Sequence, residues 1–471
     1  MSQERKSAGL GISWQLALLQ VAILASTVIT PVATDITCVG LALWAMLRPL
    51  AALQSLSVFV VIRTMNPSLI QSDAVSSALG WGIPLLVSIR ILPFIKSADL
   101  RVVGPLWLFC IVAIGCSIAT SLALTISLMK ATSLAVIVAA VLVANFRLSD
   151  SDVKSLGRWL RTLATVVATL SIASLVRPSI AYLPDTHLLQ GILSQPQALG
   201  AFLAPFSAAY VANWLFRSHR IDPGTFAIMA VLLLCMLLTL SRTAALATVL
   251  GVGMSVLGGR IPADRPARSV MGRLLGFSLV AILILCVTAL AGSGMPSSIS
   301  GFVLKHGEHN VSDAFLVSRG GGMISELRNF ASSPIVGHGF GVYADGVFPS
   351  GIVEVAGIPV SAPVEKGVLP SAVLEETGLV GFLCFTYLVF AVTGGVWKRA
   401  EPSVLALVFG CLFVNLGEAV LLSPGNIGLH VWLLIGWCLR AGMSESDADA
   451  EMIPNSVRQP AVVKPYVNLL N

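Results

Sequence analysis

The stretch GPLWLFCIVAIGCSIATSLAL at residues 104–124, followed by LMKATSLAVIVAAVLVAN at 128–145, decides the fold class of this chain. Both stretches have about the 20 apolar residues that a helix needs to cross the hydrocarbon core of a membrane. Similar stretches recur along all 471 residues, of which 56% are hydrophobic and 11% charged, against roughly 25% charged in a soluble domain. The sequence therefore predicts an all-α polytopic integral membrane protein and excludes soluble globular, collagen, coiled-coil and disordered classes.

Short polar connections separate the apolar segments, which we expect to form 12 to 14 transmembrane helices. Segments 35–47 and 50–64 are short for a full crossing and are candidates for tilted, broken or re-entrant helices. The expected segments are 12–31, 35–47, 50–64, 77–95, 104–124, 128–145, 159–176, 197–216, 224–240, 243–258, 274–292, 373–396, 403–421 and 427–440.

The distribution of basic residues predicts which side of the membrane each loop faces. Lys and Arg are enriched in cytoplasmic loops, and a topology with both termini inside places most of the 29 Lys and Arg residues on the inner side. The net charge of +6 therefore reflects topology, and we expect no nucleic-acid partner. The basic residues that fall outside are Arg63, Lys130, Arg177, Arg242, Lys305, Arg319, Arg328 and Lys366.

One connection is much longer than the others. Residues 293–372 form an outward loop rich in Gly, Pro and Ser, with a predicted short helix at 324–331, and loops of this length are usually functional or disordered. This loop divides N-terminal helices at 1–292 from C-terminal helices at 373–441. We expect a disordered cytoplasmic tail at 442–471.

Polar residues gather at the outer ends of the predicted helices. Arg242 lies in LTLSRTAALA, Glu375 and Glu376 lie in LEETGLVGF, and Glu418 lies in VNLGEAVLLSPG. We interpret the glutamate pair as the start of a helix, where carboxylates suit the positive end of the helix dipole. Glu418 is either functional, as ionisable groups within membrane spans usually are, or reaches the interface. Together these residues predict a site at the outer membrane surface.

Four stretches, in this order, resemble the O-antigen ligase and O-antigen polymerase superfamily of bacterial inner-membrane glycan-assembly enzymes. The resemblance begins near Gly191 and continues to the last span, whereas the first half agrees only in being a string of spans. It implies a protein of the bacterial inner membrane with cytoplasmic termini, in which the long outward loop is periplasmic. The stretches are SQPQALGAFLAPF at 194–206, LSRTAALATVLGVG at 240–253, SRGGGMISELRNFASSPIVGHGFG at 318–341 and LPSAVLEETGLVGFLCF at 369–385.

The resemblance also implies an activity. The enzyme would move an undecaprenyl-diphosphate-linked glycan to an acceptor hydroxyl on a glycan or glycolipid, without metal, cofactor or nucleotide sugar, among membrane lipids. The recurrent arginines of the family map to Arg242 and Arg319. An arginine carries a permanent charge and forked donors that match the phosphate oxygens of a diphosphate leaving group. Alternatively, Arg242 anchors the chain to lipid head groups.

The chain departs from the family at the expected catalytic base. Many ligases carry a His-Asn pair shortly before the Glu-Thr-Gly stretch, where this chain has Gly367 and Val368. This departure favours a polymerase-like enzyme over a lipid A ligase, and a transporter or flippase of lipid-linked oligosaccharides is the alternative from a different class. An acceptor hydroxyl still needs a group that takes its proton, and the candidates are Glu365, His338, His306 and His309. The candidate substrate-binding residues are Arg328, Glu376, Glu418 and His309.

Overall fold

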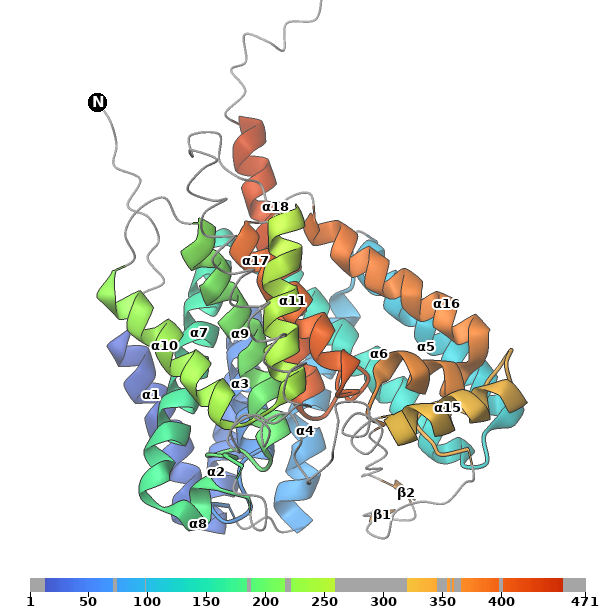
Figure 1. Cartoon of the computed structure of the whole chain (residues 1–471), viewed down its shortest axis with the longest axis horizontal. Helices are drawn as coiled ribbons and strands as arrows, with labels where there is room; N and C mark the ends of the chain where they lie inside the picture. The colour runs from blue at the N-terminus through green and yellow to red at the C-terminus, as the bar shows by residue number, and fades with distance from the viewer. Residues whose placement is uncertain are drawn as a thin grey trace, which may run out of the picture.

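The protein is almost entirely helical (Figure 1). A computed structural model describes residues 13–70, 74–97, 99–183, 188–216, 222–258, 320–344, 354–355, 358–359, 366–397 and 401–451. The elements are α1 (Trp14–Ile29), α2 (Pro31–Ala45), α3 (Pro49–Arg63), α4 (Ala74–Ile91), η1 (Leu92–Phe94), α5 (Leu100–Thr120), α6 (Leu124–Phe146), α7 (Asp150–Ala173), η2 (Ser174–Val176), α8 (Pro178–Ala181), α9 (Pro196–Phe216), α10 (Pro223–Leu238), α11 (Arg242–Gly258), α15 (Gly321–Ser332), β1 (Glu354–Val355), β2 (Ile358–Pro359), α16 (Leu369–Trp397), α17 (Pro402–Phe413), η5 (Val414–Leu416) and α18 (Ile427–Glu451).

Within these ranges, five helical segments are long and apolar enough to cross a membrane, which indicates a membrane protein. Eight shorter apolar helices of 10 to 17 residues accompany them. Every expected apolar segment overlaps a helix except 274–292, which lies outside the described residues. The long segments are Leu100–Thr120, Leu124–Phe146, Asp150–Val176, Pro196–Phe216 and Leu369–Trp397.

Local sequence signals set the helix starts. Asp222 accepts a hydrogen bond from the Thr225 amide (2.8 Å) and caps α10, and Ser149 caps α7 in the same way through Asp152 (3.2 Å). Proline also suits the first helical position, because an amide there has no partner within the helix. Helices that begin with proline include those at Pro31, Pro49, Pro223 and Pro402.

The centre of the bundle is closely packed. The short helix α3 is buried at every position from Leu50 to Ile62, and it contacts α2, α6, α7 and α18. Farther along the chain, α9, α11 and α17 pack against one another. A Cβ atom on Gly251 of α11 would lie 2.8 Å from the Ala406 carbonyl oxygen of α17, so glycine permits this close approach.

A second group of helices positions the candidate site. Helix α16 packs along α5, and α15 lies across the start of α16 (Figure 1). From there α16 runs toward the end of the bundle where α17 begins and where α18 projects. The helix predicted near 324–331 is confirmed as α15. The strands β1 and β2 form an antiparallel pair, with Glu354 opposite Pro359.

The structure describes only part of the two segments expected to be loop and tail. Of the outward loop 293–372 it describes residues 320–344, 354–355, 358–359 and 366–372. Helix α18 continues to Glu451, so the first ten residues of the expected disordered tail are helical. The alanine and glutamate residues in this stretch favour a helix that is already nucleated.

Candidate functional site

Helix α16 contains a sharp kink. Its two helical segments meet at Gly378, whose φ of 62° and ψ of −165° fall in a region of backbone conformation that is essentially limited to glycine. A Cβ atom at this position would overlap the Ile335 carbonyl group and lie 2.5 Å from the Val336 nitrogen. The kink therefore depends on a glycine and on the segment that packs against it.

That segment is residues 334–341, PIVGHGFG, which we call the glycine loop. A kink deprives nearby amides and carbonyls of their helical partners, and buried backbone groups need replacements. The glycine loop supplies them: two amides after the kink donate to loop carbonyls, and two carbonyls before the kink accept from loop amides. The four bonds are Leu379 N to Pro334 O (2.9 Å), Val380 N to Ile335 O (3.2 Å), His338 N to Glu375 O (2.9 Å) and Gly339 N to Glu376 O (2.9 Å).

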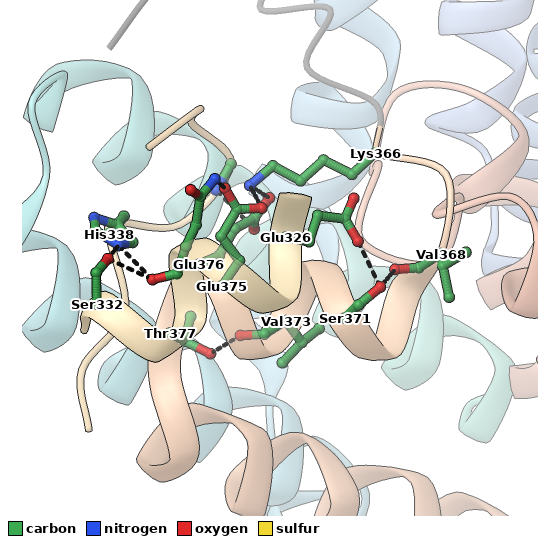
Figure 2. A network of polar contacts seen from close by, with 12 residues as sticks. Glu326, Ser332, His338, Lys366, Val368, Ser371, Val373, Glu375, Glu376 and Thr377 are labelled. Atoms are coloured by element: carbon green, nitrogen blue, oxygen red, sulfur yellow. Dashed lines mark hydrogen bonds and ion pairs between the residues drawn. The ribbon is translucent and has the colours of Figure 1, made fainter. Parts of the chain in front are cut away.

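Just before the kink, α16 carries the two carboxylates of a buried ionic cluster. The Lys366 ammonium lies 2.7 Å from Glu375 Oε2 and 3.5 Å from Glu376 Oε1 (Figure 2). All three side chains are at most 4% exposed. We call Lys366, Glu375 and Glu376 the lysine–glutamate cluster.

Each carboxylate of the cluster has a second partner from the segment that contains α15 and the glycine loop. Asn329 of α15 donates from its side-chain amide to Glu375 Oε1 (2.8 Å). The Gly341 amide donates to Glu376 Oε2 (2.8 Å). The cluster thus ties α15, the glycine loop and the start of α16 together.

The electrostatics of the cluster keep its lysine charged. Burial lowers the pKa of Lys366, but the carboxylates of Glu376 and Glu375 outweigh this effect and raise that pKa above its usual value. A buried charge is tolerated only when it is paired and hydrogen-bonded. The cluster meets this condition, because Lys366 contacts both carboxylates.

Glu326 is a further buried acid at the edge of the cluster. It accepts a hydrogen bond from the Ser371 hydroxyl and is 6% exposed (Figure 2). Burial raises the pKa of Glu326, and Glu375 and Glu376 raise it further against the opposing effects of Ser371 and Lys366. This combination of burial and neighbouring charge is typical of carboxyl groups that exchange protons.

The raised pKa of Glu326 predicts a pH-dependent stability. The folded state favours the protonated acid, so its contribution to stability is present below the unfolded pKa and is lost as pH rises through the folded pKa. We expect Glu326→Gln to match wild type near pH 4 and to exceed its thermal unfolding midpoint increasingly toward pH 8. Ser371→Ala removes the hydroxyl that lowers the pKa of Glu326. We therefore expect the midpoint difference between Glu326→Gln and its parent at high pH to be larger when both also carry Ser371→Ala. A midpoint difference that does not change with pH would contradict the assignment.

His338 of the glycine loop is half-buried, with its ring directed toward α15 (Figure 2). Its Nε2 lies 2.9 Å from the Asn329 carbonyl oxygen and 3.0 Å from the Ser332 hydroxyl. A carbonyl oxygen can only accept, so Nε2 carries the hydrogen and Nδ1 is the basic nitrogen of the neutral ring. The surrounding structure therefore sets the tautomer in which His338 could take a proton.

Arg242 and Glu418 lie on segments that touch each other. Arg242 begins α11 two residues after Leu240, whose φ of 51° is the only positive value for a non-glycine among the described residues. Such strain often accompanies functional sites. A Cβ atom on Gly417 would overlap the Thr243 side chain, so the two segments are in contact, and η5 contacts both α11 and α16.

The other sequence-predicted residues divide into two groups. Glu376 belongs to the lysine–glutamate cluster, and Arg328 is exposed on α15. The remaining candidates lie outside the described residues: Arg319, Glu365, His306 and His309.

One sequence interpretation needs correction. Glu375 and Glu376 do not start a helix, because α16 begins at Leu369 and the pair precedes the kink. Their partner is the Lys366 ammonium rather than a helix dipole. In the sequence, Lys366 stands out only as a charge expected on the outer side, and nothing singles out Glu326. The signal available for Lys366 was a lysine placed nine residues before two adjacent glutamates at the border of an apolar segment, where charged groups need partners.

No protein-family model matches this chain, and no curated protein is similar to it in sequence. In the described part of the chain, no three His, Cys, Asp or Glu side chains are grouped to hold a metal ion.

Proposed function

We propose that this protein is a membrane glycosyltransferase of the O-antigen ligase or polymerase type. It would transfer a glycan from undecaprenyl diphosphate to an acceptor hydroxyl at the periplasmic face of a bacterial inner membrane. The observation that supports the proposal is that two of the four family-like stretches, 318–341 and 369–385, contact each other although they are separate in the sequence. In the structure, the described parts of these stretches meet at the lysine–glutamate cluster and the glycine loop.

The proposed reaction breaks the bond between the anomeric carbon and the diphosphate oxygen, which leaves with the electron pair. The acceptor oxygen forms the new bond to that carbon and loses its proton to a base. We assign this role to His338, since the Asn329 carbonyl oxygen holds its Nε2 and leaves Nδ1 available. Arg242 and Arg319 would bind the diphosphate as its negative charge grows.

The lysine–glutamate cluster serves this reaction as a support rather than as a reactant. Its carboxylates are occupied by Lys366, Asn329 and the Gly341 amide. It therefore orients α15, which begins two residues after Arg319, and the glycine loop, which contains His338. Rigid support of this kind matters because catalytic groups displaced by about 1 Å lose much of their effect.

The arginine assignment predicts the glycan profile of cells. Deletion cells complemented with Arg242→Ala or Arg319→Ala, at matched membrane abundance, should show activity reduced about 100-fold or more, the scale of a lost oxyanion contact. The control is Arg177→Ala, an exposed arginine after η2, which should restore the wild-type profile.

The profile also separates the subtypes. Loss of long chains with single repeats still on their acceptor would identify a polymerase, and polymer accumulating on undecaprenyl diphosphate would identify a ligase. A normal profile from both arginine variants would contradict the site. Unchanged surface glycans after deletion would contradict the function.

A transporter of lipid-linked oligosaccharides remains the second candidate, and one observation favours it. His430 is an ionisable group within the apolar helix α18, and it is fully buried against the ring of Phe202 (centroids 4.2 Å apart). Transport pathways are built from such groups. Deletion would then leave the lipid-linked glycan inaccessible to a probe added outside the inner membrane, whereas a glycosyltransferase defect leaves it accessible.

A further inference from the structure

A small cavity lies between α7, α9, α17 and α18, away from the candidate site. Its volume is about 40 Å³, several times the space that one water molecule needs. The lysine–glutamate cluster lies at the start of α16, and α17 begins shortly after the end of α16. Ser403, near the start of α17, lines the cavity. The cavity therefore lies at the end of the bundle opposite the cluster.

Two polar side chains in the cavity wall lack hydrogen-bond partners within the described part of the chain. They are Arg161 of α7, through its Nε, and Tyr210 of α9, through its hydroxyl. Tyr210 is only 2% exposed. An unsatisfied buried polar group destabilises the protein by about 1 to 3 kcal/mol, so these two groups indicate that the cavity normally holds something that accepts hydrogen bonds.

The side chains that line the cavity favour a negatively charged occupant. No Asp or Glu is among the described residues that line the cavity. The carboxylate of Asp222, which interacts electrostatically with Tyr210, accepts bonds from the Thr225 amide (2.8 Å) and hydroxyl (2.7 Å). The indole of Trp437, also in the wall, donates to the Val153 carbonyl (2.9 Å). A permanent positive charge with forked donors therefore lies beside a free hydroxyl, and both suit an oxyanion.

The position of the cavity indicates phosphate chemistry. Arg161 is the third residue of the apolar segment 159–176, and Ser403 is the first of 403–421. Both residues thus lie at the ends of their expected spans, at the depth where lipid phosphates are within reach. We propose that this cavity binds a phosphate-class oxyanion, held by the Arg161 guanidinium and the Tyr210 hydroxyl.

The test compares two sources of the phosphate group on the purified full-length chain in a non-ionic detergent. Dioctanoyl phosphatidic acid and inorganic phosphate are each titrated, with chloride at matched ionic strength, and dissociation constants follow from the rise in thermal unfolding midpoint. Stabilisation by phosphatidic acid alone identifies a lipid headgroup, and stabilisation by both shows that the free anion also enters. Either result supports the proposal. No stabilisation beyond that of chloride overturns it.

Variants test the residues. Arg161→Gln should weaken binding by more than tenfold, and Tyr210→Phe, which keeps the ring and removes the hydroxyl, by about tenfold. Arg158→Gln removes an exposed arginine one turn away on the same helix and should change binding less than about twofold. An equal loss in Arg158→Gln would mean attraction to surface charge and would overturn the site. The proposal does not depend on the glycosyltransferase assignment, since it uses none of the same residues.

Discussion

Replacement of Lys366 by methionine is expected to lower the free energy of unfolding by about 3 to 5 kcal/mol, the effect of removing one partner from a buried ion pair. The variant leaves the carboxylates of Glu375 and Glu376 buried without the cation that lies 2.7 Å and 3.5 Å from them. Because the cluster also holds α15 through Asn329 and the glycine loop through Gly341, we expect the proposed glycan transfer to be lost as well. Thermal unfolding in detergent and glycan profiling measure the two effects.

A combined variant separates charge from packing. Lys366→Met with Glu375→Gln and Glu376→Gln keeps the shape of the two acidic side chains and one acceptor oxygen on each, for the bonds from Asn329 and Gly341, but removes every charge of the cluster. Most of the lost stability should return, because an uncharged cluster has no unpaired ion. Lys154→Met, which changes an exposed lysine on α7, is the control and should stay within about 0.5 kcal/mol of wild type. A combined variant less stable than Lys366→Met would contradict the ionic account.

Gly378→Ala is expected to destabilise the protein by about 3 kcal/mol or more. The backbone conformation at this position costs a non-glycine residue about 1 to 3 kcal/mol. In addition, the new Cβ atom would overlap the Ile335 carbonyl group. Four backbone hydrogen bonds hold the glycine loop in place there, so the loop cannot move away without losing them.

Hydrogen exchange measures this effect at the kink itself. In Gly378→Ala, we expect faster exchange at the amides of His338, Gly339, Leu379 and Val380, which form the bonds between the kink and the loop. Gly394→Ala is the matched control on the same helix. A Cβ atom there meets no atom of the described residues within 4 Å, so this change should stabilise α16 by about 0.5 to 1 kcal/mol. Unchanged protection in Gly378→Ala would show that the kink does not need glycine.

The helical class and the approximate positions of the helices follow from the amino-acid sequence alone, apart from the segment outside the described residues. These properties are local: a membrane span needs a run of apolar residues whose backbone groups bond within one helix. The sequence also predicted that polar residues such as Glu376 and His338 would matter. It correctly predicted α15, whose pattern is contained within twelve residues.

The pairing of those polar residues, in contrast, arises only when distant parts of the chain pack together. The dipole interpretation of Glu375 and Glu376 was wrong because the helix begins at Leu369 and bends at Gly378, which no local pattern reveals. The bonds from Asn329 to Glu375 and from Ser371 to Glu326 join residues about 45 positions apart. The nearby carboxylates keep Lys366 charged despite its burial, and burial together with those carboxylates raises the pKa of Glu326. Burial and proximity exist only after distant segments have packed, so they cannot be read from neighbours along the chain.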